Sequence, residues 1–195
     1  MFNKRLEKWR KERGLDITQG FKFDLNTQVS FVFEEIGVEF LRAKTEDEKI
    51  DALCDVIVFA FNGANLLGHT PNYLEGYTAD YRDILDSALD LLIVRDKTIC
   101  KHIYSLIYTV AKNRIENMGY DFEKCMDETL KEIESRTGEV NPNTGKWEKY
   151  KTDEAKAKWY KANYSRCKRG IHISNMLDDE AYHNEKDYFK CNNIK

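Results

Sequence analysis

The segment from Thr45 to Gly68 constrains the fold more than any other part of the chain. It opens with Thr45 three residues before Glu48, the spacing of a capping box at the start of a helix. The segment then becomes apolar on nearly all sides through VIVFAF (residues 56–61), and Gly68 is a typical helix end. A helix that is apolar all round has to be enclosed by other elements. The segment therefore predicts a central helix inside a helical protein.

The rest of the chain also has helical periodicity. Glycine (10) and proline (2) are scarce among the 195 residues, which favours long helices with few tight turns. Apolar residues recur at helical spacing in five further segments, which we expect to be helices: 1–14, 26–44, 79–96, 97–119 and 120–138. Residues 1–138 therefore predict one all-α domain, a helical bundle with a four-helix core. The acidic residues and the family resemblance described below add the expectation that this core binds a metal ion.

The composition changes after residue 138. Lysines alternate with aromatic residues, and Pro142 and Gly145 predict a turn, while the final residues up to 195 are polar. These residues include too few apolar side chains for a core of their own. We expect residues 139–195 to form a basic, irregular extension that packs on the same domain or on a partner subunit.

Charge and cysteine content narrow the class of protein. The formal net charge is −3, which gives no global reason to expect nucleic acid as a partner. No apolar run approaches the roughly 20 residues of a membrane span, and the charged N-terminal segment lacks the apolar centre of a secretory signal. The five cysteines show no CxxC spacing, which disfavours a disulfide framework and a zinc site. These features predict a cytoplasmic protein without a membrane partner.

Four carboxylates interrupt otherwise apolar helix faces. Glu35 and Glu39 lie four residues apart on one expected helix, and Asp51 and Asp55 lie four residues apart on the next. Residues at this spacing share a helix face. Antiparallel packing of the two helices would bring the two pairs face to face. Converging carboxylates repel one another unless a hard divalent cation binds between them, and oxygen ligands suit Mg²⁺ or Mn²⁺.

The spacing alone leaves two interpretations of these acids open. Acidic side chains on amphipathic helices usually form a solvated face that needs no ligand. Asp51 and Asp55 favour a metal site more strongly, because aspartate is a poor helix former and Asp55 leads directly into an apolar run. Asn62, seven residues after Asp55, falls near the same face two turns further along.

The order of these motifs resembles a known family. EEIGVEFLRA (residues 34–43) followed by DALCDVIVFAFNGANLLG (residues 51–68) is similar to the two metal-binding helices of the MazG-like nucleotide pyrophosphohydrolases. These enzymes belong to the all-α NTP pyrophosphatase superfamily, with the phosphoribosyl-ATP pyrophosphohydrolases and the dimeric dUTPases. MGYDFEKCMDETLKEIESRTGEVNPNTGKWEKYK (residues 118–151) also resembles the tail of phage and bacterial members. Roughly residues 25–165 take part in the resemblance.

The resemblance implies a metal-dependent hydrolase that cleaves a nucleoside triphosphate between its α- and β-phosphates. The family pattern is EExxE on one helix and ExxD on the next, whereas both pairs are spaced by four residues in this chain. Either spacing keeps a pair on one face. Catalysis is therefore assigned to Glu35 and Glu39. Metal binding is assigned to Glu35, Glu39, Asp51 and Asp55, with Glu34 and Glu48 as substitutes for Glu35 and Asp51.

Basic residues in the second motif are candidates for binding phosphate. Ser135 and Arg136 match the Ser–basic step of the family, and Lys146 and Lys149 lie in the lysine-rich hairpin. Together with Asn62 they are the expected substrate-binding residues, although lysines of this kind often serve only as solvated surface. The resemblance implies a (deoxy)nucleoside triphosphate substrate, Mg²⁺ or Mn²⁺ as cofactor, and a homodimer or homotetramer. A deoxynucleotide such as dUTP or dGTP is suggested by the family, while the motif does not specify the base.

The alternative function is that of a non-catalytic helical adaptor that binds nucleic acid or protein through the basic C-terminal segment. Basic residues interleaved with aromatic residues can follow a single strand. The net negative charge and the acidic segment LDDEAYHNEKD (residues 177–187) make nucleic acid the weaker partner.

Overall fold

The computed structural model describes residues 2–20, 25–78, 80–143 and 147–169, and the structural statements below concern these residues. The described chain is mostly helical, as predicted. Its main helical elements are α1 (Phe2–Glu12), η1 (Ile17–Gln19), α2 (Leu25–Glu34), η2 (Glu35–Phe40), α3 (Glu46–Leu66), α4 (Tyr81–Ile93), α5 (Lys97–Asn117) and α6 (Phe122–Ser135). The C-terminal residues 170–195, which were expected to be part of the basic extension, lie outside the described residues.

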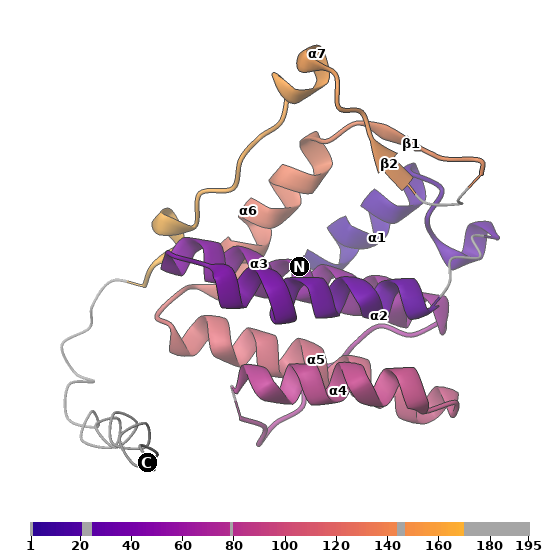
Figure 1. Cartoon of the computed structure of the whole chain (residues 1–195), viewed down its shortest axis with the longest axis vertical. Coiled ribbons are helices and arrows are strands. Elements are labelled where there is room, and N and C mark those ends of the chain that lie inside the picture. The colour runs from indigo at the N-terminus through magenta and orange to yellow at the C-terminus, as the bar shows by residue number, and fades with distance from the viewer. Residues whose placement is uncertain (1, 21–24, 79, 144–146, 170–195) are drawn as a thin grey trace, which may run out of the picture.

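Four helices form a closed bundle. α3 contacts α2 on one side and α5 on the other, while α4 contacts both α5 and α2 (Figure 1). This arrangement matches the helical part of the predicted four-helix core. Metal binding by that core is a separate question, which depends on the side chains described below.

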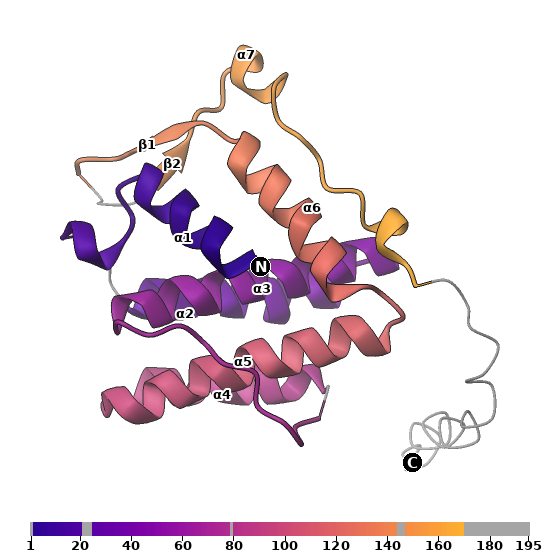
Figure 2. The ribbon, with the colours of Figure 1, turned by 180° about the vertical axis from the view of Figure 1, so that it is seen from behind.

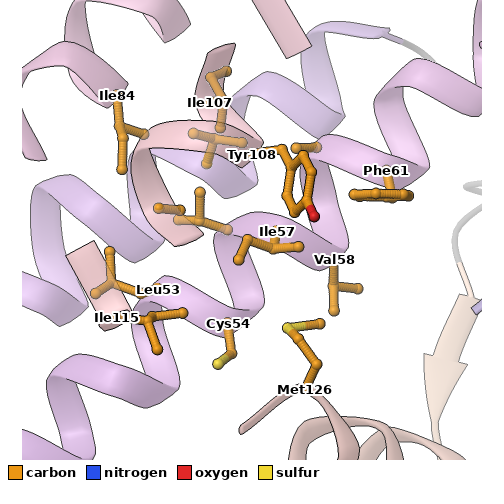
Figure 3. Close-up of a cluster of buried hydrophobic side chains, with 14 of the residues drawn as sticks. Leu53, Cys54, Ile57, Val58, Phe61, Ile84, Ile107, Tyr108, Ile115 and Met126 are labelled. Atoms are coloured by element: carbon orange, nitrogen blue, oxygen red, sulfur yellow. The ribbon is translucent and has the colours of Figure 1, made fainter. Parts of the chain in front are cut away.

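α3 is the central helix, as its sequence predicts. A capping box starts it: Glu48 N donates to Thr45 Oγ1 at 3.2 Å, and Thr45 N donates to Glu48 Oε2 at 3.1 Å. Further along, Leu53 and Ile57 are fully buried, and Phe61 packs against Tyr108 of α5 with ring centres 5.2 Å apart. Figure 3 shows these side chains within one apolar cluster. Each such burial contributes about 1.5–3 kcal/mol, so the apolar run fixes α3 among its neighbours.

Two further helices lie on one side of the bundle. α1 and α6 contact each other, and α6 packs on α3 (Figure 2). Phe2 of α1 anchors this layer, because its ring lies 5.1 Å from Phe61 and 5.6 Å from Phe122, measured between ring centres. Arg5 of α1 forms ion pairs with Asp127 and Glu134 of α6. These contacts hold α1 beside α6 and next to the central helix.

Two short strands lie on either side of the turn predicted in the basic segment, of which residues 144–146 are outside the described part of the chain. β1 (Gly138–Val140) and β2 (Trp147–Lys149) pair antiparallel, with Gly138 opposite Lys149. A side chain at position 138 would collide with the backbone of Glu148, which explains the glycine. The chain then forms α7 (Asp153–Lys156) and returns along α6 to η3 (Tyr164–Cys167), as Figures 1 and 2 show.

The returning segment is attached to α6 by backbone N–H groups. Asn163 N donates to Glu128 Oε2 at 3.0 Å, and Ala162 N donates to Glu132 Oε2 at 2.8 Å. Tyr164 is buried at the end of this run. Residues 147–169 therefore pack on the helical domain of the same chain.

No described helix has the length and apolar character needed to cross a membrane. Cys54, Cys100, Cys125 and Cys167 are all buried with free thiols. The Cys54 side chain is fully enclosed in the core.

Candidate functional site

The first pair of candidate ligands lies on a π-helical turn. α2 ends at Glu34, and the chain continues without a break as η2, which begins at Glu35. A π-helix has i→i+5 hydrogen bonds, so its turn holds about one residue more than an α-helical turn. The spacing from Glu35 to Glu39 is likewise one residue longer than the spacing of the last two acids in the EExxE pattern. The π-helical turn therefore accommodates the extra residue, and such turns are frequent at functional sites.

The apolar residues of the same helix explain why the turn widens. Val32, Ile36 and Phe40 are all buried, at a strict spacing of four residues. An α-helix of 3.6 residues per turn would rotate each successive residue by roughly 40° away from the core. A wider turn keeps Ile36 and Phe40 facing the bundle, and it keeps Glu35 close to α3.

Three of the four predicted metal ligands converge between η2 and α3. The pKa of Glu35 is raised to about 7, mainly by burial and next by the charge of Asp51. The pKa of Asp55 is raised well above its usual range by burial, and then by the charges of Asp51 and Glu35. These mutual effects place Glu35, Asp51 and Asp55 within electrostatic reach of one another, as antiparallel packing of the two helices predicts.

Asp51 differs from the other two acids in its surroundings. Burial also raises its pKa, but a hydrogen bond from the Tyr164 hydroxyl to Asp51 Oδ1, 2.8 Å long, opposes the rise. One edge of Asp51 is exposed to water. The hydrogen bond from Tyr164 therefore distinguishes Asp51 from Asp55, whose pKa is raised well above its usual range without such a bond.

The remaining acidic candidates lie at the margin of this group or outside it. Glu34 and Glu39 are exposed, although both of their charges contribute to the raised pKa of Glu35. The carboxylate of Glu48 accepts from Lys44 N and Thr45 N in the cap of α3, so the structure does not bring it to the site.

The acids do not form a finished coordination shell. Within residues 2–20, 25–78, 80–143 and 147–169, no three His, Cys, Asp or Glu side chains are arranged to hold a metal ion. Oxygen donors of this kind suit Mg²⁺, but Glu35, Asp51 and Asp55 would have to rotate towards one ion to bind it.

The raised pKa of Glu35 predicts how the stability of the metal-free protein depends on pH. The folded chain holds this proton up to a pH of about 7, while the unfolded chain releases it near 4.5. Between these values the folded state binds more protons, so the free energy of unfolding falls as the pH rises. We expect a loss of about 1–2 kcal/mol, less than the full shift would give because the side chain is partly exposed.

The measurement is urea unfolding in EDTA at pH 5 and pH 8. Glu35→Gln should weaken the dependence of the free energy of unfolding on pH. The pH dependence that remains in this variant should come from Asp51 and Asp55, because their raised pKa values act in the same direction. Glu123→Gln, at an exposed position on α6, is the matched control. An unchanged pH dependence in Glu35→Gln would contradict the convergence of the acids.

Two cations face the acids from α6 and the hairpin. Arg136 follows α6 directly, and its charge opposes the rise that burial causes in the pKa values of Glu35, Asp51 and Asp55. Glu132 holds Arg136 through an ion pair. For Lys149, burial and then the charge of Arg136 lower the pKa, while Asp55 raises it. The site therefore combines carboxylates with cations on its opposite side.

Two other predicted phosphate ligands, Ser135 and Lys146, are not shown to face the acids. Ser135 Oγ donates to Glu132 O at 2.7 Å and accepts from Tyr160 N at 2.8 Å, so its hydroxyl already holds the returning segment. Its role in phosphate binding stays a prediction. Lys146 lies outside the described residues.

A cavity of about 980 Å³ opens beside Asp55. Binding sites for small molecules commonly have volumes of about 300–1,000 Å³. One wall is a face of α3, formed by Asp55, Val58, Phe59, Asn62 and Leu66. Facing it are side chains of α1, the end of α6 and the hairpin: Trp9, Arg10, Ile133, Arg136, Trp147, Lys149 and Lys151. Asp55, Asn62, Arg136 and Lys149, which the sequence predicts as site residues, therefore share one cavity.

Four residues of the site were not found by sequence reasoning: Arg10, Gln28, Glu132 and Tyr164. Arg10 and Gln28 line the cavity, Glu132 holds Arg136, and Tyr164 holds Asp51. A signal existed for Gln28, because it is a polar residue one turn before the buried Val32. Arg10 and Tyr164 gave none, since their partners lie 52 and 113 residues away along the chain.

Comparison of the chain with known protein families, with curated proteins and with solved structures found no match. The fold and the site together define a mostly helical protein with a cavity that is lined by Asp55, one of the converging acids, and by the cations Arg10, Arg136, Lys149 and Lys151. The resemblance to the pyrophosphohydrolases rests on the motifs of the sequence.

Proposed function

We propose that this protein is a metal-dependent nucleoside triphosphate pyrophosphohydrolase, which converts a (deoxy)nucleoside triphosphate to the monophosphate and pyrophosphate. The observation that carries the proposal is the meeting of Glu35, Asp51 and Asp55 beside a cavity whose opposite wall bears Arg136 and Lys149. A polyphosphate needs divalent cations on some of its oxygens and side-chain cations on others. This arrangement offers groups for both.

Mg²⁺ is the cofactor that suits this donor set best, and Mn²⁺ has similar preferences. Glu35, Asp51 and Asp55 would hold the ion, and Glu39, exposed one turn after Glu35 on η2, is the further candidate ligand. When bound, the ion offsets negative charge on the phosphate oxygens and orients them. Repulsion between the three acids favours its binding, because the ion removes an unfavourable interaction that the folded chain otherwise keeps.

Side chains of the protein accept a proton from the attacking water and stabilise the charge on the leaving group. The carboxylate of Glu35 or Glu39 accepts a proton from water as the water oxygen bonds to the α-phosphorus. The pKa of about 7 describes Glu35 without a metal ion. A bound cation would lower this pKa, so the carboxylate would be ionised and able to accept the proton near neutral pH. The bond from the α-phosphorus to the bridging oxygen breaks, and pyrophosphate leaves with that oxygen and the electron pair. Arg136 and Lys149 stabilise the charge that develops on it.

A panel of (d)NTPs incubated with Mg²⁺ or Mn²⁺ tests the proposal. We expect release of pyrophosphate and the nucleoside monophosphate in equal amounts, and loss of both products in EDTA. Release of orthophosphate, or no turnover of any nucleotide with either ion, contradicts the proposed reaction.

The adaptor function remains the alternative, because the described acids do not form a finished metal site. The adaptor hypothesis predicts different results from the enzyme hypothesis in two further measurements. Neutralising Lys146, Lys149 and Lys151 would abolish a salt-sensitive interaction with nucleic acid or protein, while Mg²⁺ would leave the melting temperature of the wild type unchanged.

We also propose that the protein forms a homodimer or homotetramer. Four large apolar side chains at the end of α4 and the start of α5 support this: Leu89, Leu92, Ile93 and Ile99 are 47%, 39%, 75% and 51% exposed. Leu89, Leu92 and Ile93 share a helix face. Exposed apolar groups that gather in this way often mark an interface.

Ile93→Asp should therefore shift the protein towards the monomer in light scattering, with an unchanged far-ultraviolet circular dichroism spectrum. A buried charge without a partner opposes association strongly. Leu41→Asp, at a position 57% exposed near the end of η2, is the control and should leave the oligomeric state unchanged. A wild type that is monomeric at working concentration contradicts the proposal.

A further inference from the structure

The returning segment, residues 157–169, brings one buried tyrosine to the acids. Tyr164 is the first residue of η3 and is only 4% exposed. Its hydroxyl donates to Asp51 Oδ1 at 2.8 Å. η3 contacts both α3 and α6, so this tyrosine lies where the returning segment meets the two helices. The acidic group on α3 is thus contacted by a residue from the C-terminal part of the described chain.

The chain is attached on both sides of Tyr164. Before it, two backbone N–H groups donate to carboxylates of α6, as described above. After it, Asp121 N donates to Cys167 O at 2.8 Å. Arg169 N donates to Gly119 O at the same distance. A side chain carried by a backbone that is held in this way can position a ligand accurately.

The surroundings of the Tyr164 hydroxyl direct its single hydrogen to Asp51. Thr129 Oγ1 lies 3.0 Å from the Tyr164 oxygen, and it also donates to Cys125 O at 2.9 Å. A carboxylate can only accept, and it is a stronger acceptor than a neutral hydroxyl. The Tyr164 hydroxyl therefore donates to Asp51, and its oxygen faces Thr129. Burial raises the pKa of Tyr164 well above its usual range, so the phenol keeps its hydrogen.

This hydrogen bond restricts a carboxylate that is otherwise free to turn. Asp51 is exposed to water, and no other described side chain donates a hydrogen bond to its carboxylate. The terminal torsion of an aspartate has a broad distribution when nothing fixes it. With Oδ1 accepting from Tyr164, Oδ2 is the oxygen that remains for a cation.

Packing alone does not explain the hydroxyl of Tyr164. A phenylalanine would fill the same buried space without bringing a polar atom into it. Asp51 is exposed, so water could solvate its carboxylate in place of the phenol. What the hydroxyl adds is the direction in which the carboxylate points.

We propose that Tyr164 is a positioning residue of the acidic site, which holds Asp51 so that its second oxygen meets a divalent metal ion. The proposal rests on the proposed function only in that Glu35, Asp51 and Asp55 bind such an ion. Residues that hold a metal ligand by a hydrogen bond commonly change metal affinity or activity by about 10- to 100-fold when they are replaced. The returning segment is then a functional part of the site as well as a covering of α6.

Binding of Mn²⁺ in the absence of nucleotide tests this role apart from turnover. Tyr164→Phe keeps the ring and removes the hydroxyl. It should bind Mn²⁺ about 10- to 100-fold more weakly than the wild type, with free Mn²⁺ followed by electron paramagnetic resonance. The far-ultraviolet circular dichroism spectrum should be unchanged. Equal Mn²⁺ affinity in Tyr164→Phe and the wild type overturns the proposal.

Tyr160→Phe is the matched control, because it makes the same chemical change in the same segment. The Tyr160 hydroxyl donates to Glu128 on α6 and not to an acid of the site. This variant loses one attachment of the returning segment, and it should bind Mn²⁺ as the wild type does. An equal loss of affinity in Tyr160→Phe and Tyr164→Phe overturns the proposal, because the attachment of the segment would then determine metal binding.

The Mg²⁺ dependence of turnover is a second measurement that a purely structural role would not change. With a nucleoside triphosphate at saturating concentration, Tyr164→Phe should need about 10- to 100-fold more Mg²⁺ to reach half of its maximal rate. Raising the Mg²⁺ concentration should restore most of kcat. A loss of rate that is the same at every Mg²⁺ concentration overturns the positioning role.

The positioning role and the proposed reaction can fail separately. Weaker Mn²⁺ binding by Tyr164→Phe, without hydrolysis of any triphosphate by the wild type, contradicts the pyrophosphohydrolase and leaves the role of Tyr164 in place. Hydrolysis by the wild type, with the same Mn²⁺ affinity and Mg²⁺ dependence in Tyr164→Phe, overturns the role of Tyr164 and leaves the reaction in place. A wild type that binds no Mn²⁺ overturns both.

Discussion

Asp55→Asn is expected to reduce Mg²⁺-dependent pyrophosphate release by about a hundredfold or more. Asp55 is the acid with the strongest electrostatic conflict in the site, since burial and the charges of Asp51 and Glu35 all raise its pKa. In the proposed enzyme this conflict is resolved by the metal ion. An asparagine keeps the shape of the side chain, but it supplies only a neutral oxygen to the ion.

The same substitution should stabilise the metal-free protein. The neutral amide needs no compensating charge where the carboxylate is poorly solvated, so the melting temperature in EDTA should stay level or rise. Mg²⁺ should raise the melting temperature of the wild type more than that of the variant, because the ion binds only the folded site. Asp86→Asn, at an exposed position on α4, controls for the loss of one charge. Full turnover by Asp55→Asn contradicts the metal role of this residue.

The helices could be predicted because their signals are local. The capping box of Thr45 and Glu48 begins α3 in the structure as it does in the sequence. Gly14 and Gly119, which mark two expected helix ends, both have positive φ angles of 68° and 82° just after α1 and α5. Such a backbone conformation favours glycine, so the sequence carries the stop signal at the residue itself.

The sequence also predicts which acids share a helix face, but it does not predict how closely these acids approach one another. A spacing of four residues predicts a shared face for Glu35 and Glu39, and the structure explains this spacing by the π-helical turn of η2. Whether Glu39 approaches Asp55 depends on side-chain rotamers, and its side chain is exposed here. Rotamers follow from packing and bound ions, which helical periodicity does not describe.

The polar end of the cavity could not be predicted from local pattern. Arg10 appears in the sequence as one of several cations of an amphipathic helix, and only the packing of α1 beside α3 brings it to Asn62. Tyr164 reaches Asp51 because the C-terminal segment returns along α6. Long-range contacts of this kind depend on the path of the whole chain.

Loss of the Arg136 charge should impair the reaction by a different route. We expect Arg136→Gln to lower kcat/KM by about a hundredfold, since one side-chain cation that faces the phosphates is lost. Arg136 also opposes the rise in the pKa values of Glu35, Asp51 and Asp55 that burial causes. Without it those pKa values rise further, and the acidic limb of the pH–rate profile should move to higher pH.

The response to Mg²⁺ separates this variant from Asp55→Asn. Removing a cation near the acids leaves their charge less compensated, so at pH 8 Mg²⁺ should stabilise Arg136→Gln at least as much as the wild type. Arg136→Lys keeps the charge and should retain the acidic limb while losing part of kcat/KM, because an ammonium lacks the planar donors of a guanidinium. Arg82→Gln, at an exposed position on α4, is the control. If Arg136→Gln lost turnover together with its response to Mg²⁺, Arg136 would act by supporting the acids and not by binding the phosphates.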